Sequence, residues 1–318
     1  MSDLSETIEA PIGYLVDTGG LPVFYQSDVA GERTNFEGER EFRAMTVRNA
    51  RLLENKFRLD REGFAFVDHK TAVTDFRDDD QLTSVYNAEA EALVCAQTGA
   101  TRTLVFDHTR RSSSQSLREA HNARDPANAA HTDYTDWSAR KRVEAVMGDE
   151  AAALLEKRFA IVNVWRSTAG TIEEWPLALC SWDSVDDGHL HTVERRAYNR
   201  VGQTRHASFD QNNAWFYFPD MTPGEAILIK NYDTSEDGRA RYALHTSFDD
   251  PTASGSATPR ESIETRVFAF FDGRIERIHV HMQNTPPRRR GRHCIWRGGI
   301  SRRHGSDNER RVLHSHTP

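Results

Sequence analysis

The chain has 318 residues, a length that fits one large domain or two ordinary ones and allows a sizeable buried core. Hydrophobic residues make up 37% and charged residues 28%, as in soluble globular proteins, and no stretch approaches the roughly 20 apolar residues of a membrane span. The first residues lack the layout of a secretory signal, and the three cysteines form no CxxC pair. We therefore expect a cytoplasmic protein with no membrane partner, no disulfide framework and no thiolate zinc site.

The net charge of -7 is unevenly distributed along the chain. Residues 286–318 hold nine arginines and two acidic residues, whereas the remainder carries 32 basic against 46 acidic residues. An acidic body argues against nucleic-acid binding by the folded part. Residues 284–318 have no apolar periodicity, so we expect a basic, disordered tail there. An arm that binds phosphate backbones is the alternative for this tail.

Short regular segments alternate with turns in the first half of the chain. Residues 1–40 contain several turn-forming glycines and a proline, and we expect an irregular N-terminal segment. Strands are expected over 64–67 and 101–106, with a helix between them that ends before Gly99. Residues 111–130 are polar and low in apolar content, which predicts a mobile loop or lid.

The second half begins with helical segments and then changes character. The helices are expected near 143–147 and 151–157. Seven short strands follow, with turn signals between them: FAIVNVWR, LALCSW, HLHTVERR, AWFYF, EAILIKN, YALHTSF and ESIETRVFAFF. Such a series is typical of an antiparallel sandwich or barrel, and double-sheet jelly rolls often enclose a metal. We expect a mainly β protein with flanking helices, a single domain over residues 41–283 with a jelly-roll core.

Two candidate metal ligands lie in the segment PANAAHTDYTD. His131 and Asp133 point to the same side of an extended chain, because strand side chains alternate with a period of two. An imidazole and a carboxylate placed in this way can reach one metal ion. A second histidine would complete the two-histidine, one-carboxylate triad that holds iron(II) and leaves positions for substrate and dioxygen. An exposed polar strand end produces the same short motif, so His-x-Asp is weak by itself.

The best candidate for the third ligand is His245, which lies in the alternating strand YALHTSF. His189 and His191 compete from a polar segment, and His279 and His281 from a region near the end of the regular pattern. An ordinary core or edge histidine remains the alternative for His245.

An arginine suited to a carboxylate ligand follows in the segment PRESIETR. Arg260, Ser262, Glu264 and Arg266 share one face of a strand. A guanidinium can clamp the distal carboxylate of a dicarboxylic acid such as 2-oxoglutarate, and a neighbouring hydroxyl can assist. The alternative is that the two arginines pair with nearby glutamates on a solvated edge.

The chain resembles a known enzyme family in stretches that keep a consistent order over about residues 40–271. They are NARLLENKFRLDREGFAF, TGATRTLVFDHTRR, HTDYT, IVNVWR, NAWFYFPDMTPGEAILIKNYD, LHTSFDDP and PRESIETRVFAFF. They are similar to the non-haem iron oxygenases that include the gibberellin desaturases and the AsaB-, NvfI- and CmcJ-type enzymes. Ser167 departs from the family, which usually has proline after NVWR.

The resemblance implies a double-stranded β-helix, that is, a jelly roll, with iron(II) and 2-oxoglutarate. Iron would be bound by His131, Asp133 and His245, and 2-oxoglutarate by Arg260 and Ser262 with Arg266 assisting. The implied reaction uses dioxygen to hydroxylate or desaturate a small molecule, a secondary metabolite. The alternative is a non-catalytic jelly-roll accessory or binding protein of a biosynthetic pathway. A homodimer and a partner enzyme are both left open.

Residues near these motifs have two interpretations each. Asn163 and Trp165 share one face of their strand, and Trp165 is equally well explained as a core residue. Lys230 and Asp233 end a strand, where a buried pair that holds the sheet is at least as good an explanation as substrate contact. Tyr134 follows the acidic ligand and is a candidate donor that orients it.

Overall fold

In the computed structural model, residues 6–25, 35–53, 57–197 and 200–274 are described. The chain divides into two compact units, Met1–Gln283 and Asn284–Pro318, and every described residue belongs to the first. The basic tail expected over residues 284–318 lies outside the described residues.

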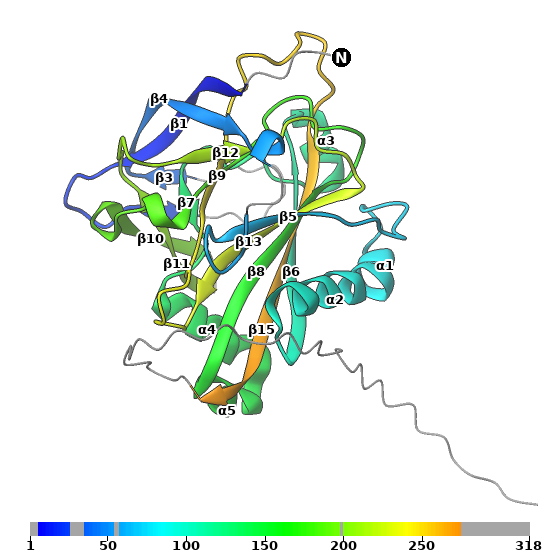
Figure 1. Ribbon diagram of the computed structural model, residues 1–318, viewed down its shortest axis with the longest axis vertical. Helices are drawn as coiled ribbons and strands as arrows, with labels where there is room; N and C mark the ends of the chain where they lie inside the picture. Colours follow the sequence, from blue (N-terminus) through cyan, green and yellow to red (C-terminus); the bar gives the residue numbers. More distant parts are fainter. Residues whose placement is uncertain (1–5, 26–34, 54–56, 198–199, 275–318) are drawn as a thin grey trace, which may run out of the picture. The chain divides into compact units, whose positions relative to one another are not determined.

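The larger of two sheets has ten strands in the order β1-β4-β12-β9-β14-β7-β11-β10-β2-β3. Figure 1 labels several of these strands, among them β1, β4, β9 and β12. They are β1 (Thr7–Val16), β2 (Val23–Tyr25), β3 (Asn35–Glu37), β4 (Glu39–Asn49), β7 (His131–Thr132), β9 (Leu177–Cys180), β10 (Leu190–Ala197), β11 (Arg200–Ala207), β12 (Trp215–Tyr217) and β14 (Leu244–Ser247). Its centre is built from short strands that are far apart in the chain, so the hydrogen-bonded neighbours are mostly non-local.

The smaller sheet has five strands in the order β5-β13-β8-β15-β6, and all of its pairs are antiparallel. They are β5 (Phe64–Asp68), β6 (Arg102–Ser112), β8 (Lys157–Ser167), β13 (Glu225–Asp233) and β15 (Glu261–Arg274). The central strand β8 is buried over most of its length, as expected for a strand covered on both faces.

Helices cover the smaller sheet. They are α1 (Asp79–Gln81), the π-helical turn η2 (Leu82–Tyr86), α2 (Asn87–Thr98), α3 (Gln115–His121), α4 (Asp136–Met147) and α5 (Ala151–Leu155). Short 3-10 turns complete the regular structure: η1 (Ala50–Leu53), η3 (Gly148–Glu150), η4 (Trp182–Ser184) and η5 (Asp187–His189). Among the described residues, no helix is long and apolar enough to cross a membrane.

Alternation along β8 divides the core into layers. Val162 and Val164 pack in a cluster with Leu93 of α2 on one face of the smaller sheet. The next residue, Trp165, packs on the opposite face with Leu179 of β9, a strand of the larger sheet. Because successive side chains of a strand point in opposite directions, one strand contacts both layers. The two sheets therefore face each other, and residues of β8 project into the space between them.

The sequence predicted the strands of the second half well. All seven expected segments contain a strand, β8, β9, β10, β12, β13, β14 or β15, and the mainly β class with flanking helices is confirmed. The strand β11 was missed. Its sequence, RVGQTRHA, has little apolar alternation, but it pairs with β10 along its whole length, so backbone pairing specifies a strand that the apolar pattern does not reveal.

The prediction of an irregular segment over residues 1–40 is wrong. Residues 7–16 form β1, which pairs with β4 along its whole length and alternates between exposed and buried positions in its first half. The expectation rested on turn residues, Gly19, Gly20 and Pro22, which all lie after this strand. The proline within β1 is tolerated because β1 is the edge strand of the larger sheet, where one side of the backbone needs no ladder partner.

The polar segment 111–130 is more ordered in the structure than a loop. It contains the end of β6 and the helix α3, whose N-cap is Ser114 with its hydroxyl accepting a hydrogen bond from the Leu117 N–H. The low apolar content of α3 hid it from the sequence analysis, because a helix without a buried face leaves no hydrophobic periodicity.

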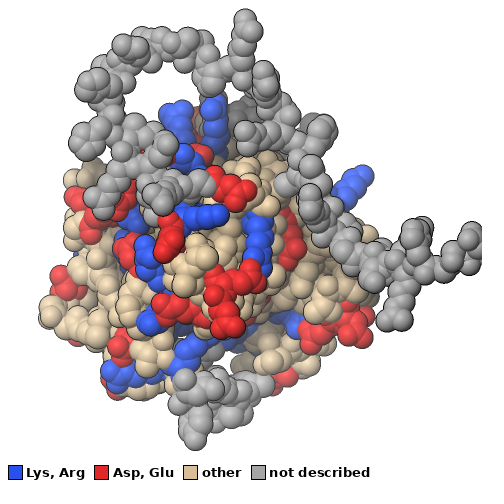
Figure 2. Space-filling view, turned by 90° about the horizontal axis from the view of Figure 1, so that it is seen from below, with Lys and Arg blue, Asp and Glu red and all other residues tan. Residues whose placement is uncertain are grey.

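Charged side chains of both signs are interspersed on the face in Figure 2. Pairs such as Lys141 with Glu144 and Arg205 with Asp136 place opposite charges side by side, at 2.8 Å in both cases.

Candidate metal centre

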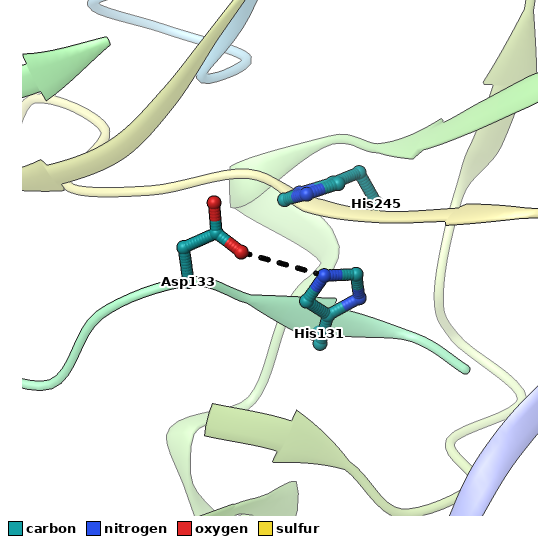
Figure 3. Close-up of side chains that lie close together, drawn as sticks. All are labelled: His131, Asp133 and His245. Atoms are coloured by element: carbon teal, nitrogen blue, oxygen red, sulfur yellow. Dashed lines mark ion pairs between the residues drawn. The ribbon is translucent and has the colours of Figure 1, made fainter. Parts of the chain in front are cut away.

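Two neighbouring strands of the larger sheet bring three predicted residues together. β7 and β14 are antiparallel neighbours, and His131 lies directly opposite His245 in their register. Asp133 follows β7 immediately. Figure 3 shows the three side chains converging, and their candidate ligand atoms all lie within 4.8 Å of one another. The sequence predicted this group of residues, and their role as metal ligands stays a prediction.

The orientation of both imidazoles is fixed by backbone carbonyl groups. Nδ1 of His131 lies 2.8 Å from the carbonyl oxygen of Ala129, and Nδ1 of His245 lies 3.3 Å from that of Ala243. When Nδ1 donates its hydrogen in this way, the lone pair is on Nε2. Both rings can therefore present Nε2 as a ligand atom.

The burial of the site indicates that these atoms need a further partner. His131, Asp133 and His245 are only 7%, 6% and 3% exposed. Nε2 of His131 is 3.5 Å from Oδ1 of Asp133, and Nε2 of His245 is buried without a hydrogen-bond partner among the described residues. Buried polar atoms nearly always have a partner. Two imidazoles and one carboxylate are the donor set of non-haem iron(II), so the residues fit this ion.

The charge states of Asp133 and His245 suit a cation. Burial, and then the nearby His131, lower the pKa of His245 to about 3, so its imidazole is neutral at neutral pH. Burial alone would raise the pKa of Asp133, but the Arg266 guanidinium, and after it the two histidines, hold that pKa well below its usual value. Asp133 is therefore an anion beside a neutral imidazole.

The predicted clamp residue Arg260 lines the same pocket as the two histidines, and its predicted helper Ser262 is its hydrogen-bond partner. Arg260 donates from Nε to Ser262 Oγ at 3.1 Å and from Nη1 to the carbonyl oxygen of Trp175 at 2.5 Å. Its guanidinium lies 5.1 Å from the ring centroid of Trp165. The pocket is lined by Arg111, His131, Trp165, His245, Arg260 and Glu264, among others.

Arg266, predicted to assist in the clamp, has carboxylate partners within the protein. It donates to Asp133 from Nε at 3.0 Å and from Nη2 at 2.9 Å, and to Asp107 from Nη1 at 2.7 Å. It also pairs with Glu264. The sequence analysis gave pairing with a nearby glutamate as the alternative for this arginine. The structure contains such a pair, but it is buried and does not lie on a solvated edge.

Sequence analysis gave no role to Arg111 or Glu264, which line the pocket. Arg111 lies opposite Ser262 in the pairing of β6 with β15, with its Nε 3.9 Å from Oε2 of Glu264. The sequence places Glu264 and Arg260 on one face of a strand, and this shared face could have predicted that Glu264 lines the pocket. For Arg111, only the register between β6 and β15 reveals the position.

The structure resolves several of the open interpretations. Asn163 donates to Oδ2 of Asp133 at 3.1 Å, whereas Tyr134 makes no hydrogen bond to it among the described residues. The competing His189 and His191 both contact Ser208 instead of the site, at 3.1 and 3.0 Å. The other two competitors, His279 and His281, lie outside the described residues.

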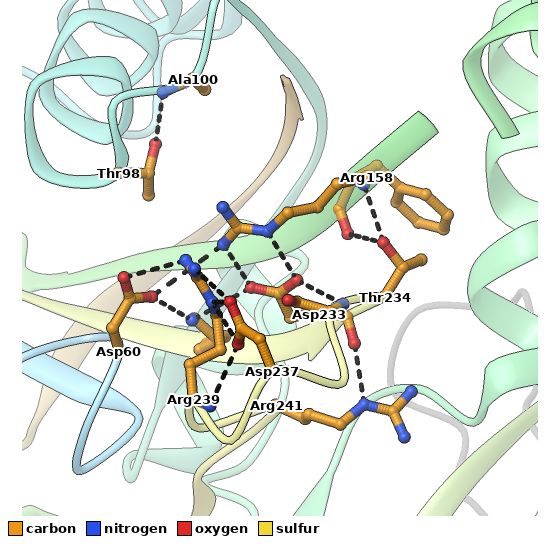
Figure 4. Close-up of polar contacts among 12 residues, drawn as sticks. Asp60, Thr98, Ala100, Arg158, Asp233, Thr234, Asp237, Arg239 and Arg241 are labelled. Carbon is orange, nitrogen blue, oxygen red and sulfur yellow. Dashed lines mark hydrogen bonds and ion pairs between the residues drawn. The ribbon is translucent and has the colours of Figure 1, made fainter. Parts of the chain in front are cut away.

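Lys230 and Asp233 form a structural pair. Nζ of Lys230 lies 3.1 Å from Oδ2 of Asp233 and 2.7 Å from Oδ1 of Asp60, and Arg158 donates twice to Asp233 (Figure 4). Both members of the pair are almost fully buried, and neither lines the pocket that holds the histidines. This agrees with the interpretation that the pair holds the sheet.

Comparison with known proteins identifies the family. The family described as "Oxidoreductase/YMDC permease-like domain" matches residues 12–270. The chain belongs to this family. It is also 34% identical over 276 residues to "Hydroxylase/desaturase CTB9" of Cercospora beticola, an alignment that covers 80% of this chain and 83% of the relative.

A second relative and a solved structure, both similar to this chain, are named for the cofactors that they use. The chain is 30% identical over 230 residues to "Fe(II)/2-oxoglutarate-dependent dioxygenase nvfI" of Aspergillus novofumigatus, which covers 70% of this chain and 81% of that protein. The structure titled "iron and alpha-ketoglutarate-dependent endoperoxidase NvfI" has a TM-score of 0.74 at 25% identity over 84% of this chain and 98% of that one. The resemblance to non-haem iron oxygenases and the expected jelly-roll fold are confirmed.

Proposed function

We propose that this protein is an iron(II)- and 2-oxoglutarate-dependent oxygenase that hydroxylates or desaturates a small-molecule secondary metabolite. The observation that carries the proposal is the buried group of His131, Asp133 and His245, whose two histidines line one pocket with Arg260. The relatives named as hydroxylase/desaturase and as Fe(II)/2-oxoglutarate-dependent dioxygenase support the same reaction class.

His131, Asp133 and His245 would hold the iron ion. Bound iron(II) would supply the activation of dioxygen that couples the oxidation of 2-oxoglutarate to the oxidation of a substrate C–H bond. The protein contributes two imidazoles and one carboxylate. The burial of these groups excludes bulk water from the place where the reaction would occur.

Arg260 would bind the far carboxylate of 2-oxoglutarate. Its bonds to Ser262 and Trp175 use Nε and Nη1, so Nη2 makes no hydrogen bond with the described residues. Burial, and then the positive charge of Arg111, lower the pKa of Arg260 to about 9. A buried guanidinium beside a second arginine is stabilised by an added anion, which favours a carboxylate ligand here.

The metal content of the protein and its turnover of 2-oxoglutarate test this proposal together. After anaerobic loading, the wild type is expected to bind about one iron(II) per chain, while His131→Ala and His245→Ala lose most of it. The wild type is also expected to form succinate from 2-oxoglutarate under air. Equal iron content in all three proteins, with melting curves that show them folded, would refute the assignment.

The same measurements separate the proposed enzyme from a non-catalytic accessory protein. An accessory protein would form no succinate even when loaded with metal and supplied with 2-oxoglutarate. Every candidate ligand is present, so no observation favours that alternative. A cytoplasmic location, a homodimer and a partner enzyme stay predictions from the sequence.

A further inference from the structure

The two carboxylate oxygens of Asp133 have different surroundings. Oδ1 faces Nε2 of His131 at 3.5 Å. Oδ2 accepts three hydrogen bonds, from Nε and Nη2 of Arg266 at 3.0 and 2.9 Å and from Nδ2 of Asn163 at 3.1 Å. Three donors occupy the acceptor capacity of one carboxylate oxygen. Only Oδ1 is therefore left to face the histidines.

The two donor residues are themselves held in place. Arg266 and Asn163 lie opposite each other in the pairing of β15 with β8. Both donate to Oε1 of the buried Glu264, Asn163 at 2.8 Å, and Arg266 also donates to Thr109 at 2.9 Å. Side chains with several fixed partners have few alternative rotamers, so the donors meet Asp133 in one defined arrangement.

The candidate ligands and the residues that donate to Asp133 come from different sheets. His131 and His245 are in strands of the larger sheet and Asp133 follows one of them, whereas Asn163, Glu264 and Arg266 are all in the smaller sheet. Asp133 lies beyond the end of the two-residue strand β7, and its own backbone N–H donates to Oδ1 of Asn231 at 3.1 Å. The sheet that carries the histidines does not by itself fix this side chain.

We propose that Arg266 and Asn163 are positioning residues that hold Oδ2 of Asp133 and so present a single carboxylate oxygen, Oδ1, to the metal ion. The inference rests on the proposed function, because it concerns the same three ligands. It gives Arg266 a role different from that of Arg260. Loss of Arg266 weakens metal binding, whereas loss of Arg260 weakens co-substrate binding.

Cobalt(II) is a suitable probe, because it takes the place of iron(II) in such sites and its visible absorption reports its coordination. Arg266→Lys keeps the charge but cannot donate two hydrogen bonds to one oxygen. Asn163→Ala removes one donor and leaves the arginine in place. We expect each change to raise the dissociation constant for Co²⁺ by roughly 10- to 100-fold and to alter the spectrum of the bound ion.

Arg158→Lys is the matched control. Arg158 also lies in the smaller sheet and donates from Nε and Nη2 to a carboxylate, that of Asp233, which does not line the pocket of the histidines. The same substitution there should leave the affinity for Co²⁺ and the spectrum as in the wild type. Melting curves of the metal-free proteins show which variants fold, and if Arg266→Lys does not fold, Asn163→Ala decides.

Three results would overturn the inference. Folded Arg266→Lys and Asn163→Ala proteins with wild-type affinity and spectrum would refute the positioning role and leave the proposed function intact. An equal effect of Arg158→Lys would show that loss of any buried arginine of the smaller sheet weakens the site. A wild type that binds no Co²⁺ or iron(II) would refute the proposed function, and the inference with it.

Discussion

At the scale of single residues, two arginines of one strand face have different partners. Arg260 bonds to a hydroxyl and a carbonyl group, whereas Arg266 bonds to three carboxylates. The sequence placed both on one face of the strand, but it left open which of them binds 2-oxoglutarate. The charge already neutralised around Arg266 favours Arg260, because an unneutralised guanidinium gains more from an incoming anion.

Replacing Arg260 with leucine is expected to weaken the binding of 2-oxoglutarate by about thirtyfold, or roughly 2 kcal/mol, since a charge-assisted contact is lost. The affinity for Co²⁺ should change little, because Arg260 contacts no candidate ligand. Calorimetric titration of the metal-loaded protein with 2-oxoglutarate measures the first quantity. Unchanged binding of 2-oxoglutarate by a folded Arg260→Leu protein would contradict this assignment of the clamp.

At the scale of elements, β6 and its neighbours carry a histidine that burial keeps neutral. The ring of His108 lies between Oγ1 of Thr265 in β15 and Oδ1 of Asn87 in α2, each at 2.9 Å. Burial lowers the pKa of His108 below its usual value of 6.5, and Arg110 contributes to the lowering against the opposing effect of Asp107. The structure thus gives this histidine a packing role between three elements.

The pH dependence of stability follows from the lowered pKa of His108. Below about pH 6.5 His108 is protonated in the unfolded chain but stays neutral in the folded protein. Its contribution to the unfolding free energy is therefore complete above that pH and is lost as the pH falls. We expect the metal-free protein to lose unfolding free energy between about pH 7 and pH 5, by at most about 1.4 kcal/mol per pH unit for this site.

His108→Gln tests that prediction, because glutamine can bond to both partners of the ring but does not titrate. Urea unfolding at the two pH values should show a smaller loss for the variant than for the wild type. Identical losses in the two proteins would show that His108 does not contribute, and that other buried histidines account for the whole effect.

At the scale of the whole molecule, buried charges connect segments that are distant in the chain. Asp233 at the end of β13 contacts Lys230 and Arg158, and Lys230 also contacts Asp60 in the turn before β5 (Figure 4). The backbone of Lys230 binds both Gly63 and Ala243, the residue two positions before His245. The network therefore lies beside the strand that carries a candidate ligand without contacting the ligand itself.

Replacing Lys230 with methionine is expected to lower the unfolding free energy by about 3 kcal/mol, because it removes one partner of a buried charge. Arg158 still pairs with Asp233, which places the effect at the lower end of such losses. Urea unfolding measures it. Lys141→Met is the control, because Lys141 and Glu144 are an exposed pair, for which we expect a loss of less than about 0.5 kcal/mol. Similar losses in the two variants would contradict the structural role of Lys230.

Local periodicity determined what the sequence could predict. A period of two placed His131 and Asp133 on one side, put Arg260 and Ser262 on another strand face, and revealed the strands of the second half. Segments without such a signal were missed, because an edge strand with Pro11 and the polar strand β11 are specified by pairing with partners elsewhere in the chain.

Only the tertiary structure decided which distant residues meet. The register of β7 with β14 places His245 opposite His131, and the facing of the two sheets directs Arg266 and Asn163 at Asp133. These contacts join segments far apart in the chain, so no local pattern encodes them. The physical reason is that strand register and sheet packing depend on the whole set of pairings, whereas the direction of a side chain depends only on its neighbours in the strand.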